Sequence, residues 1–265
     1  MSTSVHKQFL EHAASIFKQD ENILGLAVGG SWAEQEIDVF SDLDLILVTR
    51  SKIAGDAQLM RAHAERLGSV LTAFTGEHVG DPRLLICLFE NPLLHVDIKF
   101  VTPDEANRRA LDPVIVFEKD EVLTNALSSA KAEWPFAGYQ WFEDRFWKWI
   151  HYTASKLGRG EYFETHDAIS FIRSNVLGPM LAQKYDKYPR GMRKIEQYLS
   201  AEDRKRLENT VTGLGPQELL RATMEVALLN RALRELLFPD TSNWRISAEH
   251  AAMEYLEKIG QQIPS

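Results

Sequence analysis

Residues 29–48 read GGSWAEQEIDVFSDLDLILV, and this stretch decides the fold class that we expect. A glycine pair and a serine, Gly29, Gly30 and Ser31, close a short apolar run. About a dozen residues further on, Asp42 and Asp44 open a second run that is otherwise almost wholly apolar. Side chains two positions apart on a strand point to the same face, so we expect both carboxylates on one side of a β-strand.

A third carboxylate, that of Asp97, lies further along the chain on another predicted strand. Two like charges on a strand with apolar neighbours are costly unless a cation holds them, and a divalent metal carrying a nucleotide's phosphates is the natural candidate. Asp97 lies in HVDIKFV (95–101), where His95, Asp97 and Lys99 alternate with apolar residues. This period of two predicts a strand with one polar face, so all three carboxylates can project onto one face of a sheet.

This order of residues resembles the core of the nucleotidyltransferase superfamily, which has a Gly-Ser turn, an Asp-x-Asp pair and a carboxylate on a later strand. Length and the helical second half resemble the small bacterial enzymes that modify lincosamides and aminoglycosides. The resemblance implies that Asp42, Asp44 and Asp97 are catalytic and hold Mg²⁺, as two ions. It also implies that the turn at residues 29–31 binds the phosphates of ATP or another nucleoside triphosphate.

A weaker resemblance lies in SKLGRGEYFE (155–164), which is similar to a Lys…Arg-Gly-Glu stretch in some antibiotic nucleotidyltransferases. It nominates Lys156 as a phosphate contact and Glu161 as an acceptor-binding carboxylate. The alternative is a glycine-rich helix end with charges that face solvent. We expect Asp97 rather than Glu161 to be the general base, because its strand should lie beside the Asp-x-Asp strand and near the reacting phosphate.

The implied reaction transfers a nucleoside monophosphate, AMP from ATP, to a hydroxyl of a small molecule and releases pyrophosphate. An antibiotic and a metabolite are both open as acceptors, and the sequence does not indicate an oligomeric state. Two other functions would use the same residues: a catalytically idle nucleotide-binding or regulatory module, and a metal-dependent phosphohydrolase. A phosphate-loop ATPase is not expected, since no Gly-Lys-Ser/Thr follows the glycines.

Each part of the pattern also has an ordinary structural interpretation. Ser31 with Glu34 three residues later forms a capping-box sequence, which predicts a helix N-cap at Ser31. The Asp-x-Asp pair is also typical of a loop that ends before a strand. Asp97 also fits an exposed edge residue close to Lys99.

Composition narrows the class of protein. Of the 265 residues, 45% are hydrophobic and 26% charged, which is ordinary for a globular protein. Cys87 is the single cysteine and excludes an internal disulfide. We see no signal-peptide pattern at the N-terminus and no apolar run long enough to cross a membrane, so we expect a cytoplasmic protein without a membrane partner.

The distribution of charge argues against a nucleic-acid partner. The first 132 residues carry 12 Lys and Arg and 20 Asp and Glu, whereas residues 133–265 carry 18 of each kind. Binding to nucleic acid depends on neutralising phosphates with basic side chains. The formal excess of negative charge therefore lies on the half with the proposed metal site and favours a small-molecule acceptor.

The pattern along the chain predicts an α+β fold with two domains: a catalytic nucleotidyltransferase domain at 1–132 and a helical acceptor-binding domain at 133–265. In the aromatic stretch YQWFEDRFWKWIHY (139–152), we expect a core helix or domain seam, with stacking on a base or an acceptor ring as the alternative. We expect strands at 23–29, 42–48, 84–89, 95–101 and 113–117, and helices at 5–19, 59–70, 139–158, 163–185, 190–210, 216–237 and 246–260.

Overall fold

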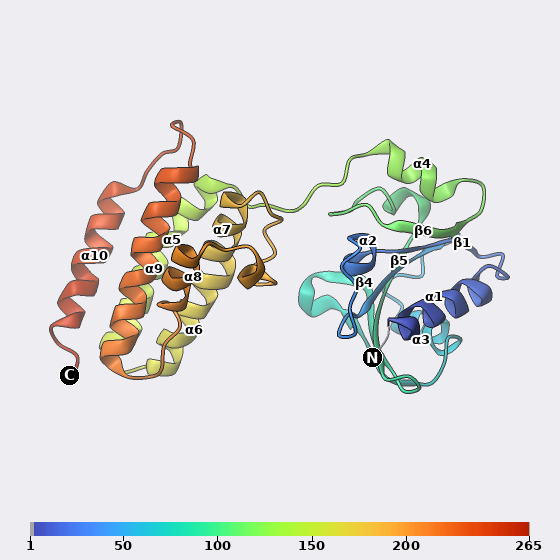
Figure 1. Ribbon diagram of the computed structural model, residues 1–265, viewed down its shortest axis with the longest axis horizontal. Coiled ribbons are helices and arrows are strands. Elements are labelled where there is room, and N and C mark those ends of the chain that lie inside the picture. The colour runs from blue at the N-terminus through green and yellow to red at the C-terminus, as the bar shows by residue number, and fades with distance from the viewer. Residues whose placement is uncertain (1–2, 265) are drawn as a thin grey trace. The chain divides into compact units, whose positions relative to one another are not determined.

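The computed structural model describes residues 3–264, and the chain forms two compact units that divide between Trp134 and Pro135. The first unit combines a mixed sheet with helices and the second is helical (Figure 1). The predicted α+β fold class is confirmed. The catalytic role given to residues 1–132 and the acceptor-binding role given to residues 133–265 stay predictions.

A six-stranded sheet organises the first unit, in the order β3-β4-β5-β2-β1-β6. The central strands β2 and β5 are parallel, so both strands begin at the same end of the sheet. The other neighbouring pairs are antiparallel. The strand bounds are Ile23–Val28 for β1, Leu43–Thr49 for β2, Val70–Gly76 for β3, Asp81–Phe89 for β4, Leu94–Val101 for β5 and Val114–Glu118 for β6.

Helices cover the two faces of this sheet differently. Helices α1 (Ser4–Phe17) and α3 (Ala57–Glu65) pack on one face and bury the leucines at positions 43, 45 and 47 of β2. Helix α4 (Val122–Ser129) packs on the other face, where Leu123 joins Ala27 and Val48 in a smaller core. Strand alternation therefore turns Asp44, between Leu43 and Leu45, away from the leucine core.

In this unit, two local predictions are wrong and one helix was not predicted. The helix predicted for 59–70 ends at Glu65, and Val70 starts the edge strand β3. Helix α4 was not predicted. Ser31 is not a helix N-cap: Gly29 is the N-cap of the short helix α2 (Gly30–Ala33), and Ser31 lies inside its first turn.

The second unit contains three helices that match their predicted ranges: α5 (Tyr139–Gly158), α9 (Pro216–Leu237) and α10 (Ile246–Gly260). The range 163–185 is divided into α6 (Tyr162–Ile172), a π-helical turn (Arg173–Leu177) and α7 (Gly178–Lys184). The prediction of one helix over 190–210 is wrong, because positive φ values at Gly191 and Lys194 interrupt the chain before α8 (Ala201–Glu208).

The aromatic stretch of α5 forms much of the core of the second unit. Phe142, Phe146, Trp147 and Ile150 are almost completely buried against α6, α9 and α10. This is the core helix that the sequence favoured. Trp149 borders this buried group of α5 residues and is only partly buried, so part of its side chain remains accessible to a ligand.

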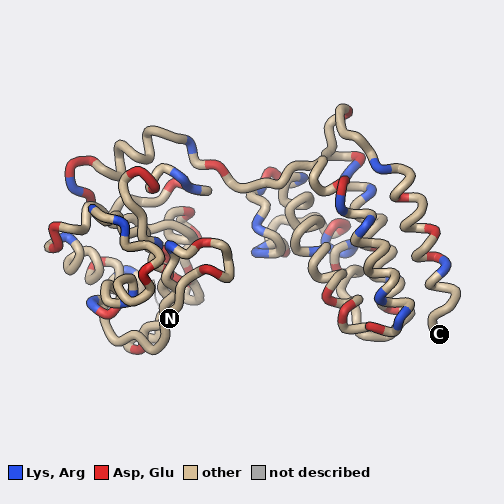
Figure 2. The backbone as a smooth tube through the Cα atoms, turned by 180° about the vertical axis from the view of Figure 1, so that it is seen from behind, with Lys and Arg blue, Asp and Glu red and all other residues tan. Residues whose placement is uncertain are grey.

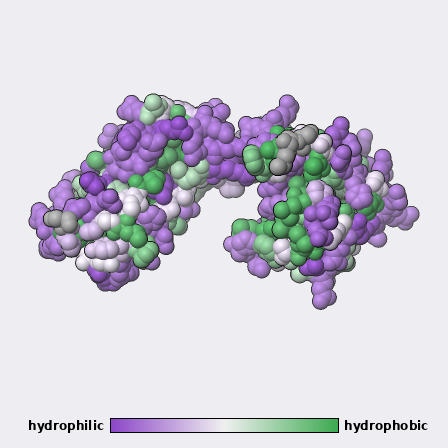
Figure 3. Space-filling model, turned by 60° about the horizontal axis from the view of Figure 1, so that its bottom comes forward, coloured by the Kyte–Doolittle hydropathy of each residue, from purple (hydrophilic) through white to green (hydrophobic). Residues whose placement is uncertain are grey.

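Surface properties differ from place to place on each unit. Acidic and basic segments alternate along the chain in both units (Figure 2). Hydrophobic residues gather on the face of the first unit that Figure 3 presents; the large exposed hydrophobic side chains of this unit include Phe40, Leu71, Phe74, Val79 and Leu93. In the described part of the chain, no helix has the length and apolar character that crossing a membrane requires.

Candidate active site

Strand register brings two of the three predicted carboxylates together. Asp44 on β2 is the direct partner of Asp97 on the parallel neighbour β5. Asp42 directly precedes β2, at the end of the sheet where β5 also begins. The Asp-x-Asp pair and Asp97 therefore meet at the parallel seam of the sheet, as the period-two patterns predicted. Asp97 is not an edge residue, because β5 lies between β4 and β2.

His95 connects Asp97 with Asp42. Its Nε2 lies 2.8 Å from Asp97 Oδ1, and its Nδ1 lies 3.9 Å from Asp42 Oδ2. The sequence placed His95 on the same polar face as Asp97 but gave it no role. The alternation of His95 and Asp97 was the available signal, whereas its position opposite Asp42 depends on the register between β2 and β5.

The glycine turn lies against Asp44. The Gly29 N–H donates to the Asp44 carbonyl oxygen at 2.8 Å. Gly30 has a φ of +53°, and a Cβ at that position would lie 1.8 Å from Asp44 Oδ2. Glycine is therefore required twice at position 30, by the left-handed backbone and by the carboxylate that occupies the side-chain space. The turn and the Asp-x-Asp pair belong to one site.

Ser31 provides a buried polar group beside this turn. The residue is 8% exposed, and its Oγ has no hydrogen-bond partner among the described residues. A buried hydroxyl without a partner costs free energy, which a ligand that bonds to it would recover. This is the second feature of the turn that favours a ligand over a purely structural role.

The electrostatics of Asp97 also favour the binding of a cation. Burial raises the pKa of this carboxyl, the charge of Asp42 raises it further, and His95 opposes both effects. A bound cation would remove this penalty, because it stabilises the ionised form. The three carboxylates supply the hard oxygen ligands that suit Mg²⁺. Within residues 3–264, no three His, Cys, Asp or Glu side chains, Asp42, Asp44 and Asp97 included, are arranged so that they could hold a metal ion together.

Lys99, the third polar residue of β5, belongs to a different group. Its Nζ lies 2.8 Å from Asp81 Oδ2 on β4, and Arg83 binds both carboxylate oxygens of Asp81. These two cations hold the pKa of Asp81 far below its usual range, against the opposing effect of burial. Lys99 is therefore engaged by Asp81, so the alternative in which it accompanies Asp97 is not supported.

The two residues nominated in the second unit bind each other. Lys156 Nζ lies 2.6 Å from Glu161 Oε2 at the C-terminal end of α5. This hydrogen bond raises the pKa of Lys156 and lowers that of Glu161. The side chains are 18% and 40% exposed, which makes Lys156 a partly covered cation rather than a freely solvated one. Their nucleotide- and acceptor-binding roles stay predictions.

Comparison with known proteins gave structural neighbours. No family model matches the chain, and no curated protein does. An aminoglycoside 6-adenyltransferase from Bacillus subtilis is similar at 18% sequence identity and a TM-score of 0.43, over 95% of this chain and 96% of that one. A CCA-adding enzyme in complex with CTP is similar at 12% identity and a TM-score of 0.34, over 99% of this chain and 66% of that one. Both neighbours are nucleotidyltransferases.

Proposed function

We propose that this protein transfers AMP from ATP to a hydroxyl of a small molecule and releases pyrophosphate. The observation that carries the proposal is the meeting of Asp44 and Asp97 on adjacent parallel strands, with the Gly30 turn pressed against Asp44. A structural ion pair would explain a single buried carboxylate. It does not explain two adjacent carboxylates, a third nearby, and a glycine turn with a buried unpaired hydroxyl.

Each residue has a role that follows from its position. Asp42 and Asp44 would hold Mg²⁺, and Asp97 would join them at a second ion. Mg²⁺, when bound, neutralises the triphosphate and stabilises the attacking and leaving oxygens of an in-line displacement at phosphorus. The turn at Gly29 and Gly30 lets the chain approach the β and γ phosphates closely, and the Ser31 hydroxyl donates to one of their oxygens.

Asp97 is the proposed general base. Its carboxylate takes the proton of the acceptor hydroxyl, whose oxygen then bonds to the α phosphorus while the bond to the β-phosphate oxygen breaks. A base must lie within hydrogen-bond reach of the proton that it accepts, and Asp97 is beside the metal-binding Asp44 where the α phosphate would lie. A cation bound at the site would keep Asp97 ionised at neutral pH, so that its carboxylate can accept this proton.

The proposed acceptor is a small hydroxyl compound, an antibiotic or a metabolite, rather than a nucleic acid. The first unit carries the whole formal excess of acidic residues, and this negative charge repels the phosphate backbone of a nucleic acid. The proposed place of Lys156 is on the phosphates of the nucleotide, and that of Glu161 is on the acceptor. Both roles require the ion pair between these two side chains to open.

A labelled-transfer assay tests the proposal. The full chain is incubated with Mg²⁺, ATP labelled at the α phosphate and a panel of antibiotics, hydroxylated metabolites and tRNA, and parallel reactions contain CTP, GTP or UTP. We expect label on a small molecule, with pyrophosphate formed only when that acceptor is present. Pyrophosphate without an acceptor would indicate a hydrolase, and label on tRNA alone would contradict the acceptor class.

Paired variants separate the site from general damage. Asp44→Asn removes one charge from the site and should abolish label transfer without unfolding the protein. Asp120→Asn is the matched control, because Asp120 is exposed and has a φ of +52°, a conformation that asparagine tolerates well. Transfer at the wild-type rate by Asp44→Asn would show that the carboxylates do not form the active site.

A further inference from the structure

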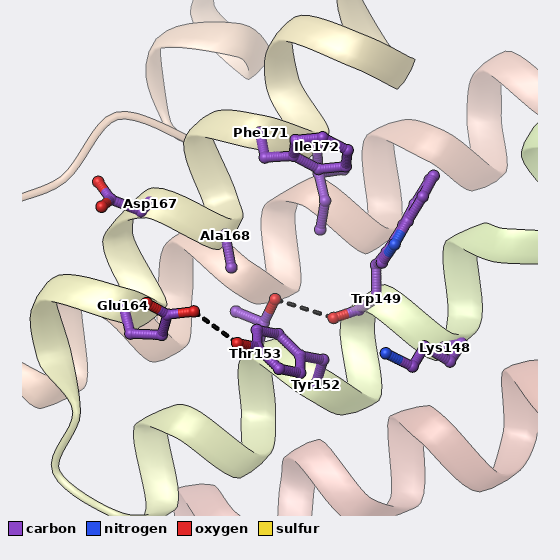
Figure 4. Close-up of a pocket in the computed structure, with 9 residues that line it drawn as sticks. All are labelled: Lys148, Trp149, Tyr152, Thr153, Glu164, Asp167, Ala168, Phe171 and Ile172. Atoms are coloured by element: carbon purple, nitrogen blue, oxygen red, sulfur yellow. Dashed lines mark hydrogen bonds between the residues drawn. The ribbon is translucent and has the colours of Figure 1, made fainter.

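The second unit contains a cavity that the proposed reaction does not use. It has a volume of about 350 Å³ and lies between α5 and α6 (Figure 4). Its lining includes three aromatic side chains, two carboxylates and one ammonium group, namely Trp149, Tyr152, Phe171, Glu164, Asp167 and Lys148. This size is within the range of small-molecule sites, and an apolar lining with a few polar groups is typical of them.

Aromatic rings make one wall of the cavity. Trp149 and Phe171 meet edge to face, with their ring centroids 5.3 Å apart. Phe171 is 45% exposed, even though it contacts Trp149 and is followed by Ile172 on the same helix. The π-helical turn that starts at Arg173 follows directly, and such turns are frequent at functional sites because they redirect side chains. An apolar ring placed against this wall would bury surface that now contacts water.

Carboxylates lie at the opposite side of the cavity from Trp149, as Figure 4 shows. Glu164 and Asp167 are three positions apart on α6 and therefore lie on the same side of the helix. Glu164 accepts a hydrogen bond from the Tyr152 hydroxyl. The Asp167 side chain is 83% exposed, and its Oδ1 lies 3.8 Å from His166 Nδ1. Both carboxylates retain oxygen lone pairs for a ligand.

Two lysines near the cavity compensate this acidic side only in part. Lys148 Nζ lies 5.0 Å from the centre of the Tyr152 ring. Lys156 Nζ lies 5.2 Å from the same ring, is bound by Glu161 and also interacts electrostatically with Glu164. The lining thus has two negative groups and one positive group. A ligand that is positively charged at one end and apolar at the other matches this arrangement.

We propose that this cavity binds a small amine that carries an apolar ring. The ring packs against Trp149 and Phe171, and the ammonium group donates to Glu164 and Asp167. No residue of the carboxylate site takes part, so the proposal goes beyond nucleotidyl transfer and stands or falls separately from it.

Three probes with the same ring and different end groups test the proposal on the full chain: 2-phenylethylamine, 2-phenylethanol and phenylacetate. The readout is the NMR signal of the Trp149 indole N–H, identified by its loss in Trp149→Phe. We expect the amine to shift this signal with a Kd at least about tenfold lower than the alcohol, because bonds to a charged group add roughly 1.4 kcal/mol or more. Phenylacetate should bind more weakly than the alcohol.

Charge-removing variants then locate the ammonium group. The double variant Glu164→Gln, Asp167→Asn should raise the Kd of the amine to that of the alcohol, while binding of the alcohol stays the same. Glu254→Gln on α10 is the control, because it removes one exposed carboxylate outside the cavity. Equal binding of amine and alcohol, tighter binding of phenylacetate, an unchanged amine Kd in the double variant, or no shift with any probe would each overturn the proposal.

Discussion

Two groups of charged side chains, one buried in the second unit and one half-buried in the first, differ in how they are neutralised. In the second unit, Arg234 is 3% exposed and lies 3.1 Å from Glu143 and 2.7 Å from Glu249, and Arg231 also binds Glu249. In the first unit, Asp42 and Asp97 have His95 between them, and the pKa of Asp97 is raised.

The difference separates a charged group that the chain itself neutralises from one that we propose to be functional. The carboxylates of the second unit have permanent guanidinium partners in the chain itself, although Glu143 Oε2, Glu249 Oε2 and Arg234 Nε have no hydrogen-bond partner among the described residues. The carboxylates of the first unit repel each other and would gain stability from a divalent cation. The contrast predicts which substitutions will affect chemistry and which will affect folding.

The largest effect expected is on turnover, and it distinguishes the two candidate bases. Asp97→Asn should lower the transfer rate by roughly 100- to 10,000-fold and weaken Mg²⁺ binding at the same time, because Asp97 is proposed as both ligand and base. Glu161→Gln should leave Mg²⁺ binding and the transfer rate at saturating acceptor near wild type, because its proposed role is to bind the acceptor. Single-turnover kinetics with labelled ATP and a Mg²⁺ titration measure them. Loss of turnover in Glu161→Gln with Mg²⁺ and ATP binding intact, while Asp97→Asn still transfers, would make Glu161 the base.

The structural group should respond in stability. Arg234→Met leaves Glu143 and Glu249 buried with less compensation, and removing one partner of such a group typically costs about 3–5 kcal/mol. Urea denaturation of the full chain measures this loss. If Arg234→Met unfolds at the wild-type urea concentration, the network is not the structural counterpart that we describe.

Gly30 and Gly55 form a matched pair with a smaller effect. Both have positive φ, but a Cβ at Gly55 meets nothing within 4 Å, whereas one at Gly30 collides with Asp44 Oδ2. Alanine should cost about 1–2 kcal/mol of stability at either position because of the left-handed backbone. Only Gly30→Ala should also reduce transfer, since it displaces a catalytic carboxylate. Equal activity of the two variants in the transfer assay would contradict the role of the turn.

The smallest effects expected are shifts in the pH dependence of stability, and they have opposite signs. The raised pKa of Asp97 makes its ionised form unfavourable in the fold, so in EDTA Asp97→Asn should stabilise the protein at neutral pH and lose this advantage as the pH falls below the unfolded value. The lowered pKa of Asp81 means the reverse: Asp81→Asn should destabilise the protein at neutral pH, and this difference should begin to shrink as the pH falls below the unfolded value. Thermal unfolding between pH 3 and pH 8 measures both. The same sign for both variants would contradict the comparison.

The sequence predicted most of the parts that have a strong period. An apolar run located β2, alternation of polar and apolar residues located β5, and long amphipathic stretches located α5, α9 and α10. The edge strand β3 was missed because its exposed side chains, such as Leu71 and Phe74, do not alternate with polar ones in a regular way. Helix α4 has only eight residues, too few for a clear helical period.

The sequence nominated the residues of the candidate site but not all of their contacts. Asp42 and Asp44 follow from their spacing on one strand and Asp97 from the family pattern, whereas the pairing of Asp44 with Asp97 also depends on the register of β2 with β5. The contacts of His95 with two carboxylates require the register of β2 with β5, which no local pattern encodes. The cavity beside Trp149 likewise depends on how α5 packs on α6.

Cooperative binding of Mg²⁺ and ATP tests the central claim most directly, because the carboxylates should repel the triphosphate until a cation enters. Calorimetric titration of ATP into the full chain should give clear binding with Mg²⁺ and little or none with EDTA, and Asp44→Asn should lose the Mg²⁺-dependent binding while Asp120→Asn keeps it. Equal affinity for ATP with Mg²⁺ and with EDTA, or wild-type binding of Mg²⁺ and ATP by Asp44→Asn, would contradict the account.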